Sequence, residues 1–322
     1  MCAYEEEIET LASNRMTGYN LGRLISSYFT PFLLTILVAT RLGHASYYTL
    51  TLFSTSLLFV CYFVTFKLSK GYEGNGRAGR LKAEKLTAQQ IGKAIISAPQ
   101  FIPLIIADVT STLGSFLLPG LLVYMYRYVI QGGDMMTWMA THNLATGIAT
   151  LGGAYMARWV MKRIENKKVL LILMYLCIAV FIFSTRFVTQ NVYLFIALSA
   201  IGLFFQGITQ PIENTLIYDV ALIANAKTGE DATSTFIALG QYNARIAGLL
   251  RGVIISVLFN AIHYDPTQPV TETLRGGFTT AYSLAFSVVP IVGAIVMLLF
   301  YNIGPKQIKD ARAVVDARNS NA

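Results

Sequence analysis

The sequence predicts an all-α membrane protein, and three properties lead to that prediction. Hydrophobic residues make up 54% of the 322 residues and charged residues only 13%, whereas an average soluble domain is about 25% charged. The mean hydropathy is +0.53. Several apolar runs also reach the roughly 20 residues that an α-helix needs to cross a bilayer. A soluble fold of this length could not bury so many runs of that kind.

About eight spanning helices are expected from the apolar runs. They cover roughly residues 19–42, 46–68, 99–128, 134–162, 167–186, 190–222, 233–264 and 275–303. Several are longer than one crossing requires, which permits tilt or extension beyond the lipid. Short polar hinges separate the later spans, as in a helical bundle with tight loops.

Lysine and arginine residues set the expected orientation. They gather in residues 67–93, 158–168 and 306–318, whereas the alternate loops contain few of them. Loops rich in these residues usually remain on the cytoplasmic side. We therefore expect a multi-pass protein of the cell inner (plasma) membrane with both termini in the cytoplasm. The net charge of +8 then reflects membrane topology and not nucleic-acid binding.

One linker divides the chain. Glycines interrupt residues 71–79, and residues 81–98 predict an amphipathic helix along the membrane surface. The expected parts are two helices of an N-terminal half (1–68), a cytoplasmic middle loop (69–98), a six-helix C-terminal half (99–303) and a cytoplasmic tail (304–322). Many transporters have two equal halves around such a loop, so about four helices are expected to be missing before the first. A complete eight-helix protein is the alternative.

Arg245 lies near the middle of the expected span 233–264. A guanidinium at the bilayer centre is costly, and such residues usually face a bundle interior or a water-filled cavity. Gln241 precedes it by four residues, so the two are expected to share one helix face. An amide beside a guanidinium, which presents several N–H donors in one plane, can bind the hydroxyl groups or a carboxylate of a substrate. Arg23, near the cytoplasmic end of the first span, either snorkels to the interface or serves the same site.

Acidic and amide side chains also interrupt two other spans. Asp108 is expected roughly 13 Å deep in the third span, where an acid needs water or a partner. In the sixth span, Pro211 is expected to kink the helix and free carbonyls beside Glu213 and Asn214. Broken helices with polar side chains at membrane depth often form substrate sites. A simple packed kink is the alternative.

Asp219 lies nearer the cytoplasmic end of the sixth span. We expect it to pair with a cation such as Arg158 in a gate rather than to touch a substrate. With Asp108 and Glu213, these residues form an expected gating or charge network. The cysteines and histidines are scattered without ligand spacing, so neither a metal site nor a cofactor is expected.

Three sequence runs resemble one family. Residues 14–23 (NRMTGYNLGR) resemble the entry to the fifth helix of glycoside–pentoside–hexuronide:cation symporters, the melibiose-permease group of the major facilitator superfamily. Residues 124–129 (YMYRYV) resemble the end of that family's seventh helix. The strongest match joins residues 218–219 (YD), 225–229 (NAKTG) and a cationic residue, Arg245, after the lysine. The resemblance covers nearly the whole chain and implies a major-facilitator-like bundle containing helices five to twelve of twelve.

The resemblance also implies roles for particular residues. Arg23 matches the family's sugar-binding arginine of the fifth helix, and Arg245 matches a sugar-site lysine of the eleventh. Gln210 and Gln241 fall where neighbouring sugar-site residues lie. Asn214 is added as a substrate-binding candidate because of its place in the sixth span. The family's cation-binding acids belong to the first four helices, so the Na⁺ or H⁺ site is expected in helices that this chain lacks.

The expected function is therefore secondary active transport, in which a sugar or glycoside moves with Na⁺ or H⁺ by alternating access. The expected partners are that substrate, the coupling cation and the lipid bilayer. An enzyme is not expected, because the sequence shows no set of catalytic groups at one depth. The alternative is a truncated, non-transporting or sensor-like membrane protein derived from the same family.

Overall fold

The computed structural model describes residues 10, 12–25, 45–70, 87–130, 135–267 and 271–320, and these are almost entirely helical. Residues 12–25 form the first helical segment. The helices that follow are α2 (Ala45–Ser69), α4 (Ala88–Ser97), α5 (Phe101–Tyr124), α6 (Met135–Arg163), α7 (Lys167–Ser184), α8 (Val192–Thr228), α9 (Thr233–Gly240), α10 (Asn243–Ala261), α11 (Glu272–Phe300) and α12 (Pro305–Ser320). A π-helical turn, η1 (Met125–Val129), extends α5, and a 3₁₀ turn, η2 (Thr185–Phe187), follows α7. Within these ranges there is no strand, so the predicted all-α fold class is confirmed.

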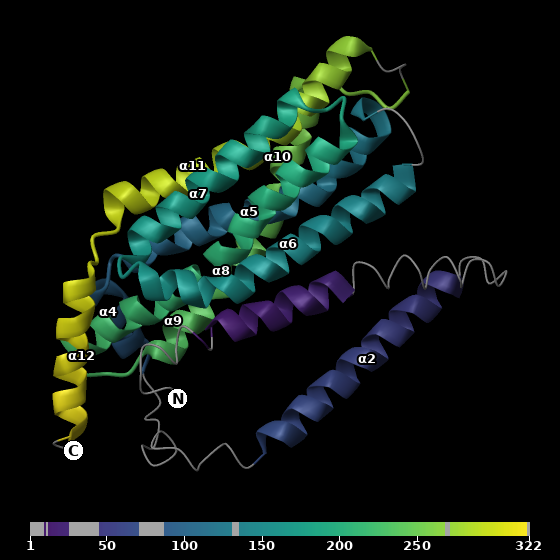
Figure 1. The fold of residues 1–322 in the computed structure, drawn as a ribbon. Helices are drawn as coiled ribbons and strands as arrows, with labels where there is room; N and C mark the ends of the chain where they lie inside the picture. Colours follow the sequence, from purple (N-terminus) through teal and green to yellow (C-terminus); the bar gives the residue numbers. More distant parts are fainter. Residues whose placement is uncertain are drawn as a thin grey trace.

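The C-terminal part forms one helical bundle (Figure 1). Its helix α8 packs against α6 and α7, while α11 packs against α5 and α7, and α10 packs against α5. Leucine, isoleucine and aromatic side chains fill the space between them. The first helical segment lies against this bundle: Ser13 donates a hydrogen bond to the carbonyl of Ala154 on α6, 2.6 Å away.

Six stretches of the described residues are long and apolar enough to cross a membrane. They are Thr51–Leu68, Phe101–Val129, Lys167–Phe187, Val192–Thr228, Thr233–Ala261 and Glu272–Phe300. The expected span 134–162 forms the long helix α6, which is not among the six because its threonine, histidine and asparagine residues make it less apolar. Most of the expected span 19–42 lies outside the described residues.

Helix α8 corrects the prediction of a broken sixth span. It runs for 37 residues without interruption through Pro211, a length of about 55 Å at 1.5 Å per residue. It also continues past the predicted end at residue 222. Gly229 ends it in the left-handed conformation, with φ of 84°, where a residue without a Cβ avoids strain. Residues 225–228, expected in a loop, therefore belong to the last turn of the helix.

The interrupted helix lies elsewhere. The expected span 233–264 is divided into α9 and α10 by a turn at Gln241 and Tyr242. Gly240 disfavours a continuous helix and approaches α8 closely, since a Cβ at this position would lie 2.8 Å from Ile217. Beyond the turn, the amide of Arg245 bonds to the carbonyl of Tyr242, three residues back. The prediction that Gln241 and Arg245 share one helix face is therefore wrong, because the helix is interrupted between them.

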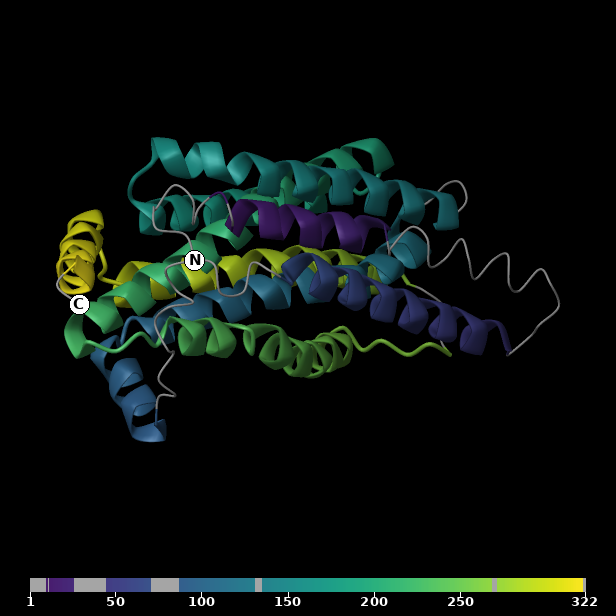
Figure 2. The same ribbon diagram turned by 90° about the horizontal axis from the view of Figure 1, so that it is seen from below.

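Short helices cover one end of the bundle (Figure 2). Arg318 of α12 donates to the carbonyls of Asn225 and Ala226 at the C-terminus of α8. Lys227 donates to the carbonyl of Ser97 at the end of α4. Helix α4 begins with a capping box between Thr87 and Gln90. The amphipathic helix expected over residues 81–98 is thus present over 88–97, and residues 71–86 lie outside the described part.

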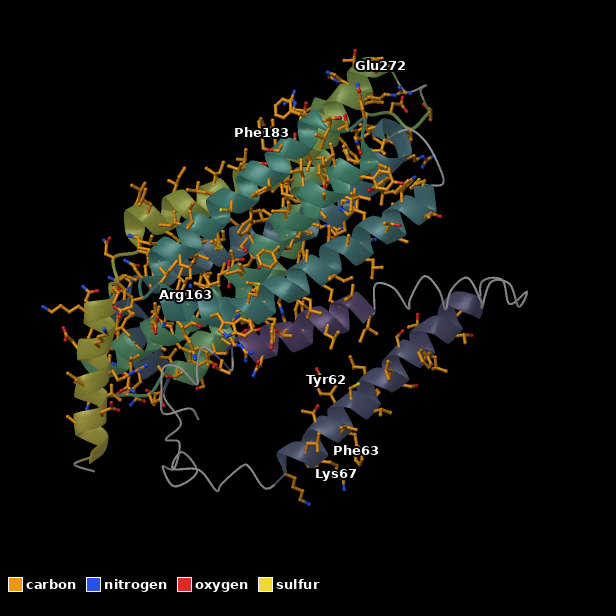
Figure 3. All side chains as sticks on the ribbon, in the orientation of Figure 1. Tyr62, Phe63, Lys67, Arg163, Phe183 and Glu272 are labelled. Carbon is orange, nitrogen blue, oxygen red and sulfur yellow. The ribbon has the colours of Figure 1, made fainter. Side chains whose placement is uncertain are left out.

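Helix α2 differs from the other apolar helices because its candidate span, Thr51–Leu68, has no buried residue. Tyr62, Phe63 and Lys67 extend from it without reaching the bundle (Figure 3). Its apolar side chains are therefore exposed around the whole helix.

Two glycines allow α6 and α8 to approach at backbone distance. A Cβ on Gly153 would overlap the carbonyl oxygen of Phe204, and a Cβ on Gly207 would overlap that of Thr150. Small residues at such crossings are typical of helix packing in membranes. This contact fixes the position of α8, which carries the polar side chains of Gln206, Gln210 and Glu213.

We expect Gly153→Ala and Gly207→Ala to destabilise the protein by about 1–3 kcal/mol, because backbone atoms on the facing helix must move. Gly248→Ala on α10 is the matched control, since nothing lies within 4 Å of its Cβ position. There the same change should be neutral or stabilising, because alanine favours helices. Thermal melting of the purified variants measures the difference. Equal melting temperatures for all three would contradict the close crossing.

Candidate functional site

Helix α8 carries polar side chains in two different environments. Gln206 and Glu213 are buried, with 3% and 4% of their surface exposed. Gln210 and Asn214 are only partly buried. The first pair points into the packed C-terminal bundle, while Gln210 of the second pair contacts the first helical segment. These two environments divide the predicted site residues into separate groups.

The buried group centres on two carboxyl groups. Asp108 of α5 is 5% exposed, and Thr112 Oγ1 donates to its Oδ1 at 3.4 Å. Glu213 and Asn243 are neighbours of the same carboxyl. The Tyr175 hydroxyl on α7 donates to Glu213 Oε1 at 2.6 Å and also lies 3.2 Å from the carbonyl oxygen of Ala107. Four helices, α5, α7, α8 and α10, therefore contribute to this carboxyl pair. The expected place of Asp108 and Glu213 in a gating or charge network stays a prediction.

A second polar contact lies next to the pair. The amide of Gln206 donates to the hydroxyl of Ser111 at 2.9 Å. Gln206 is seven residues, or two helical turns, before Glu213, and Ser111 is three residues after Asp108. The same two helices thus hold both contacts, and hydrogen bonds satisfy polar groups that would be costly if left alone in a buried site.

The half-buried group lies at the junction between α8 and the first helical segment. Asn20 donates to Gln210 Oε1 at 3.0 Å, and Asn214 donates to the carbonyl of Gln210 at 2.8 Å. Arg23 is exposed and three residues beyond Asn20, so it lies on the same side of that helix. The structure therefore places Gln210 against the helix of Arg23, with Asn214 one turn further along α8.

The two candidates from the interrupted helix are exposed. Gln241 lies in the turn, and Arg245 lies in the first turn of α10. The Arg245 guanidinium is 5.3 Å from the centre of the Tyr242 ring, a cation–π contact. The described residues show no ion pair between Arg245 and either Asp108 or Glu213. The guanidinium is thus available to an external partner.

The prediction that Asp219 pairs with Arg158 needs correction. The cation that contacts Asp219 is Lys167, at the start of α7, with Nζ 3.4 Å from Oδ2 and both side chains buried. The Arg158 guanidinium instead lies over the rings of Tyr155 and Trp159. Arg158 follows Ala157, which is buried in the bundle core, and the helix rotation turns it toward these aromatic neighbours.

Sequence reasoning missed Tyr175, Ser111, Gln206 and Lys167. A signal for Gln206 was present: Ser199, Gln206 and Glu213 recur every seven residues on α8, so they follow one helix face. Ser111 follows Asp108 by three residues and lies on one face with it. Tyr175 and Lys167 gave no such signal, because a tyrosine and a terminal lysine are ordinary in a membrane helix.

Comparison with known proteins identifies the family. Residues 2–304 match the MFS/sugar transport protein family. The chain belongs to this family. The match covers nearly the whole sequence and agrees with the helical membrane bundle, and the matched family is one of transporters and not of enzymes.

A similar curated protein is an uncharacterized symporter, YjmB, of Bacillus subtilis (strain 168). It is 23% identical over 188 residues, which are 58% of this chain and 40% of that relative. The match therefore spans less than half the length of the relative. MFS family membership is shown for this chain, whereas the substrate and any coupling ion are matters of proposal.

The Lys167–Asp219 contact predicts a strong effect of one amide substitution. Asp219→Asn removes the negative partner of a buried ammonium, and breaking such a pair costs about 3–5 kcal/mol. The control is Glu165→Gln, which breaks the exposed Lys309–Glu165 pair at 3.6 Å and should cost at most about 1 kcal/mol. Chemical unfolding of the purified variants gives both values. Similar losses for the two substitutions would contradict a buried pair that stabilises this end of the bundle.

Proposed function

We propose that this protein takes part in cation-coupled uptake of a sugar or glycoside by alternating access. The family match over residues 2–304 carries the proposal. The symporter named among its relatives supports coupling to a cation. The resemblance to glycoside–pentoside–hexuronide:cation symporters, carried by residues 14–23, 124–129 and 218–245, points to the same substrate class.

The polar candidates of α8, the first helical segment and the interrupted helix support the proposed substrate class. Sugars present many hydroxyl groups, each of which donates and accepts hydrogen bonds. Gln210 and Asn214 offer amides that do both, and Arg245 offers five donors in a fixed fork. Arg23 adds a second guanidinium on the first helical segment. We assign substrate binding to these four residues together with Gln241.

We further propose that both termini face the cytoplasm. Arg163, at the end of α6, and Glu272, at the start of α11, lie at opposite ends of the bundle (Figure 3). The end with Arg163 also holds Lys162, Lys167, Lys168, Lys227 and the basic helix α12. An excess of lysine and arginine is typical of the cytoplasmic side.

Arg245 gives the direct test. Arg245→Ala should weaken sugar binding by about tenfold or more, because a charge-assisted hydrogen bond contributes about 1.5–3 kcal/mol. Arg245→Lys should retain part of the affinity, since it keeps the charge but not the fork. Arg251→Ala is the matched control, because Arg251 is another exposed arginine of α10. Binding of radiolabelled sugars to the purified, membrane-reconstituted variants measures these effects.

Two outcomes would contradict this assignment. If a well-folded Arg245→Ala protein bound the sugar normally, Arg245 would not belong to the substrate site. If wild-type protein bound none of a broad panel of sugars and glycosides while remaining folded, a sensor-like or non-transporting protein would replace the transporter proposal.

A further inference from the structure

The buried carboxyl pair of Asp108 and Glu213 is not explained by sugar binding. Asp108 is 5% and Glu213 4% exposed. The Tyr175 hydroxyl lies 2.6 Å from Glu213 Oε1 and 3.2 Å from the carbonyl oxygen of Ala107, the residue before Asp108, so the two carboxyls are neighbours in one buried cluster. They come from different helices, α5 and α8, so their contact results from the tertiary fold and not from neighbouring positions in the sequence. The substrate-binding candidates Gln210 and Asn214 lie on the more open side of α8.

The surroundings of the pair supply hydrogen bonds and no positive charge. Tyr175 of α7 donates to Glu213, Asn243 of α10 and Thr112 of α5 lie near Asp108, and Ser111 lies near Glu213. Helix α11 packs on this region through Gly293, which lies near Thr110 and Tyr175, and through Phe286. Neither residue carries a titratable group. In the described part of the chain, no ion pair joins Asp108 or Glu213 to a lysine, arginine or histidine.

Two cations on helices next to the pair have other contacts. Lys167 contacts Asp219, which is six residues from Glu213 and therefore about 9 Å further along the helix. Arg245 is exposed and lies over Tyr242. Two carboxylates in contact, away from water and without a cation, repel each other strongly, and a buried site of this kind retains a proton on one of them.

We propose that Asp108 and Glu213 share one proton and form a proton-binding site inside the C-terminal bundle. In this site, the protonated carboxyl donates its hydrogen to the ionised one, and Tyr175 donates to Glu213. Release of the proton leaves two adjacent carboxylates, so it requires water or a cation to reach the pair. The site is separate from any cation site in other helices, and the inference does not depend on the sugar assignment.

A second group of buried polar side chains lies further along α8, toward the other end of the bundle. His142 of α6, Ser199 of α8 and Tyr282 of α11 are at most 1% exposed. His142 Nε2, Ser199 Oγ and the Tyr282 hydroxyl have no hydrogen-bond partner among the described residues. All three side chains lie close together, because Phe195 packs against both His142 and Tyr282 and Tyr282 approaches Ser199. Such groups are normally satisfied by internal water.

The face of α8 connects this group to the carboxyl pair. Ser199, Gln206 and Glu213 follow at seven-residue intervals, which places each about 10 Å from the next. Between Ser199 and Glu213 on this face, the amide of Gln206 donates to the hydroxyl of Ser111. The pair and the group near His142 therefore lie along one polar face of α8, and polar chains inside membrane proteins mark proton relays when water joins their members.

Infrared spectroscopy of the purified chain in lipid nanodiscs tests the shared proton. A protonated carboxyl has a carbonyl-stretch band that an ionised carboxylate lacks, and deuterium exchange shifts it. We expect this band in the wild type at neutral pH and in Glu272→Gln, whose carboxyl is exposed. The double variant Asp108→Asn/Glu213→Gln should lose it. His142→Phe should keep the band and slow its deuterium shift severalfold.

Three results would overturn the proposal: absence of the band in the wild type, its persistence in the double variant, or its loss when NaCl is added at constant pH. The last result would assign the pair to Na⁺ instead. If the double variant does not fold, the single variants Asp108→Asn and Glu213→Gln decide, because each must change the frequency or area of a band that belongs to both groups. An unchanged band in both would also overturn the proposal. Sugar binding is measured separately, so its loss or retention leaves this result intact.

Discussion

The cost of placing polar groups inside a membrane protein governs how this bundle is arranged. A buried carboxyl is too costly to keep unless it has partners. This chain buries two neighbouring carboxyls, those of Asp108 and Glu213, and each has partners. The hydroxyl of Tyr175 and the amide of Asn243 reach the pair from two further helices. Buried hydrogen bonds therefore constrain how α5, α7 and α8 pack together, while the surrounding leucine and isoleucine side chains supply the remaining packing.

Helix α8 links this core to the more open side of the molecule. Its glycine crossing with α6 at Gly153 and Gly207 fixes its position, and from there it presents Glu213 to the interior and Gln210 to the first helical segment. Proton binding and sugar recognition, as proposed, thus occur on adjacent faces of one rigid helix. A small rotation or tilt of α8 would change both environments together, which is the kind of linkage that alternating access requires.

Much of the fold followed from the sequence, because apolar runs of membrane length are a strong signal. The boundaries of α2, α5, α6 and α7 lie close to those expected. The interruption at Gln241 was not predicted, since Gly240 and its contact with Ile217 depend on tertiary packing. Similarly, the sequence indicated that Asp108 needs a partner. That the partner is Glu213 depends on how α5 packs against α8. Lys167 instead of Arg158 contacts Asp219 because α7 begins beside the inner face of α8.

A double-mutant cycle on the carboxyl pair tests the central claim most directly. Unfolding free energies are measured for the wild type, Asp108→Asn, Glu213→Gln and the double variant, all at neutral pH. If the two side chains act as one proton-sharing unit, their effects are coupled by about 1 kcal/mol or more. Effects that add to within about 0.5 kcal/mol, as for independent distant sites, would contradict a shared proton and with it the interaction that this account places at the centre of the bundle.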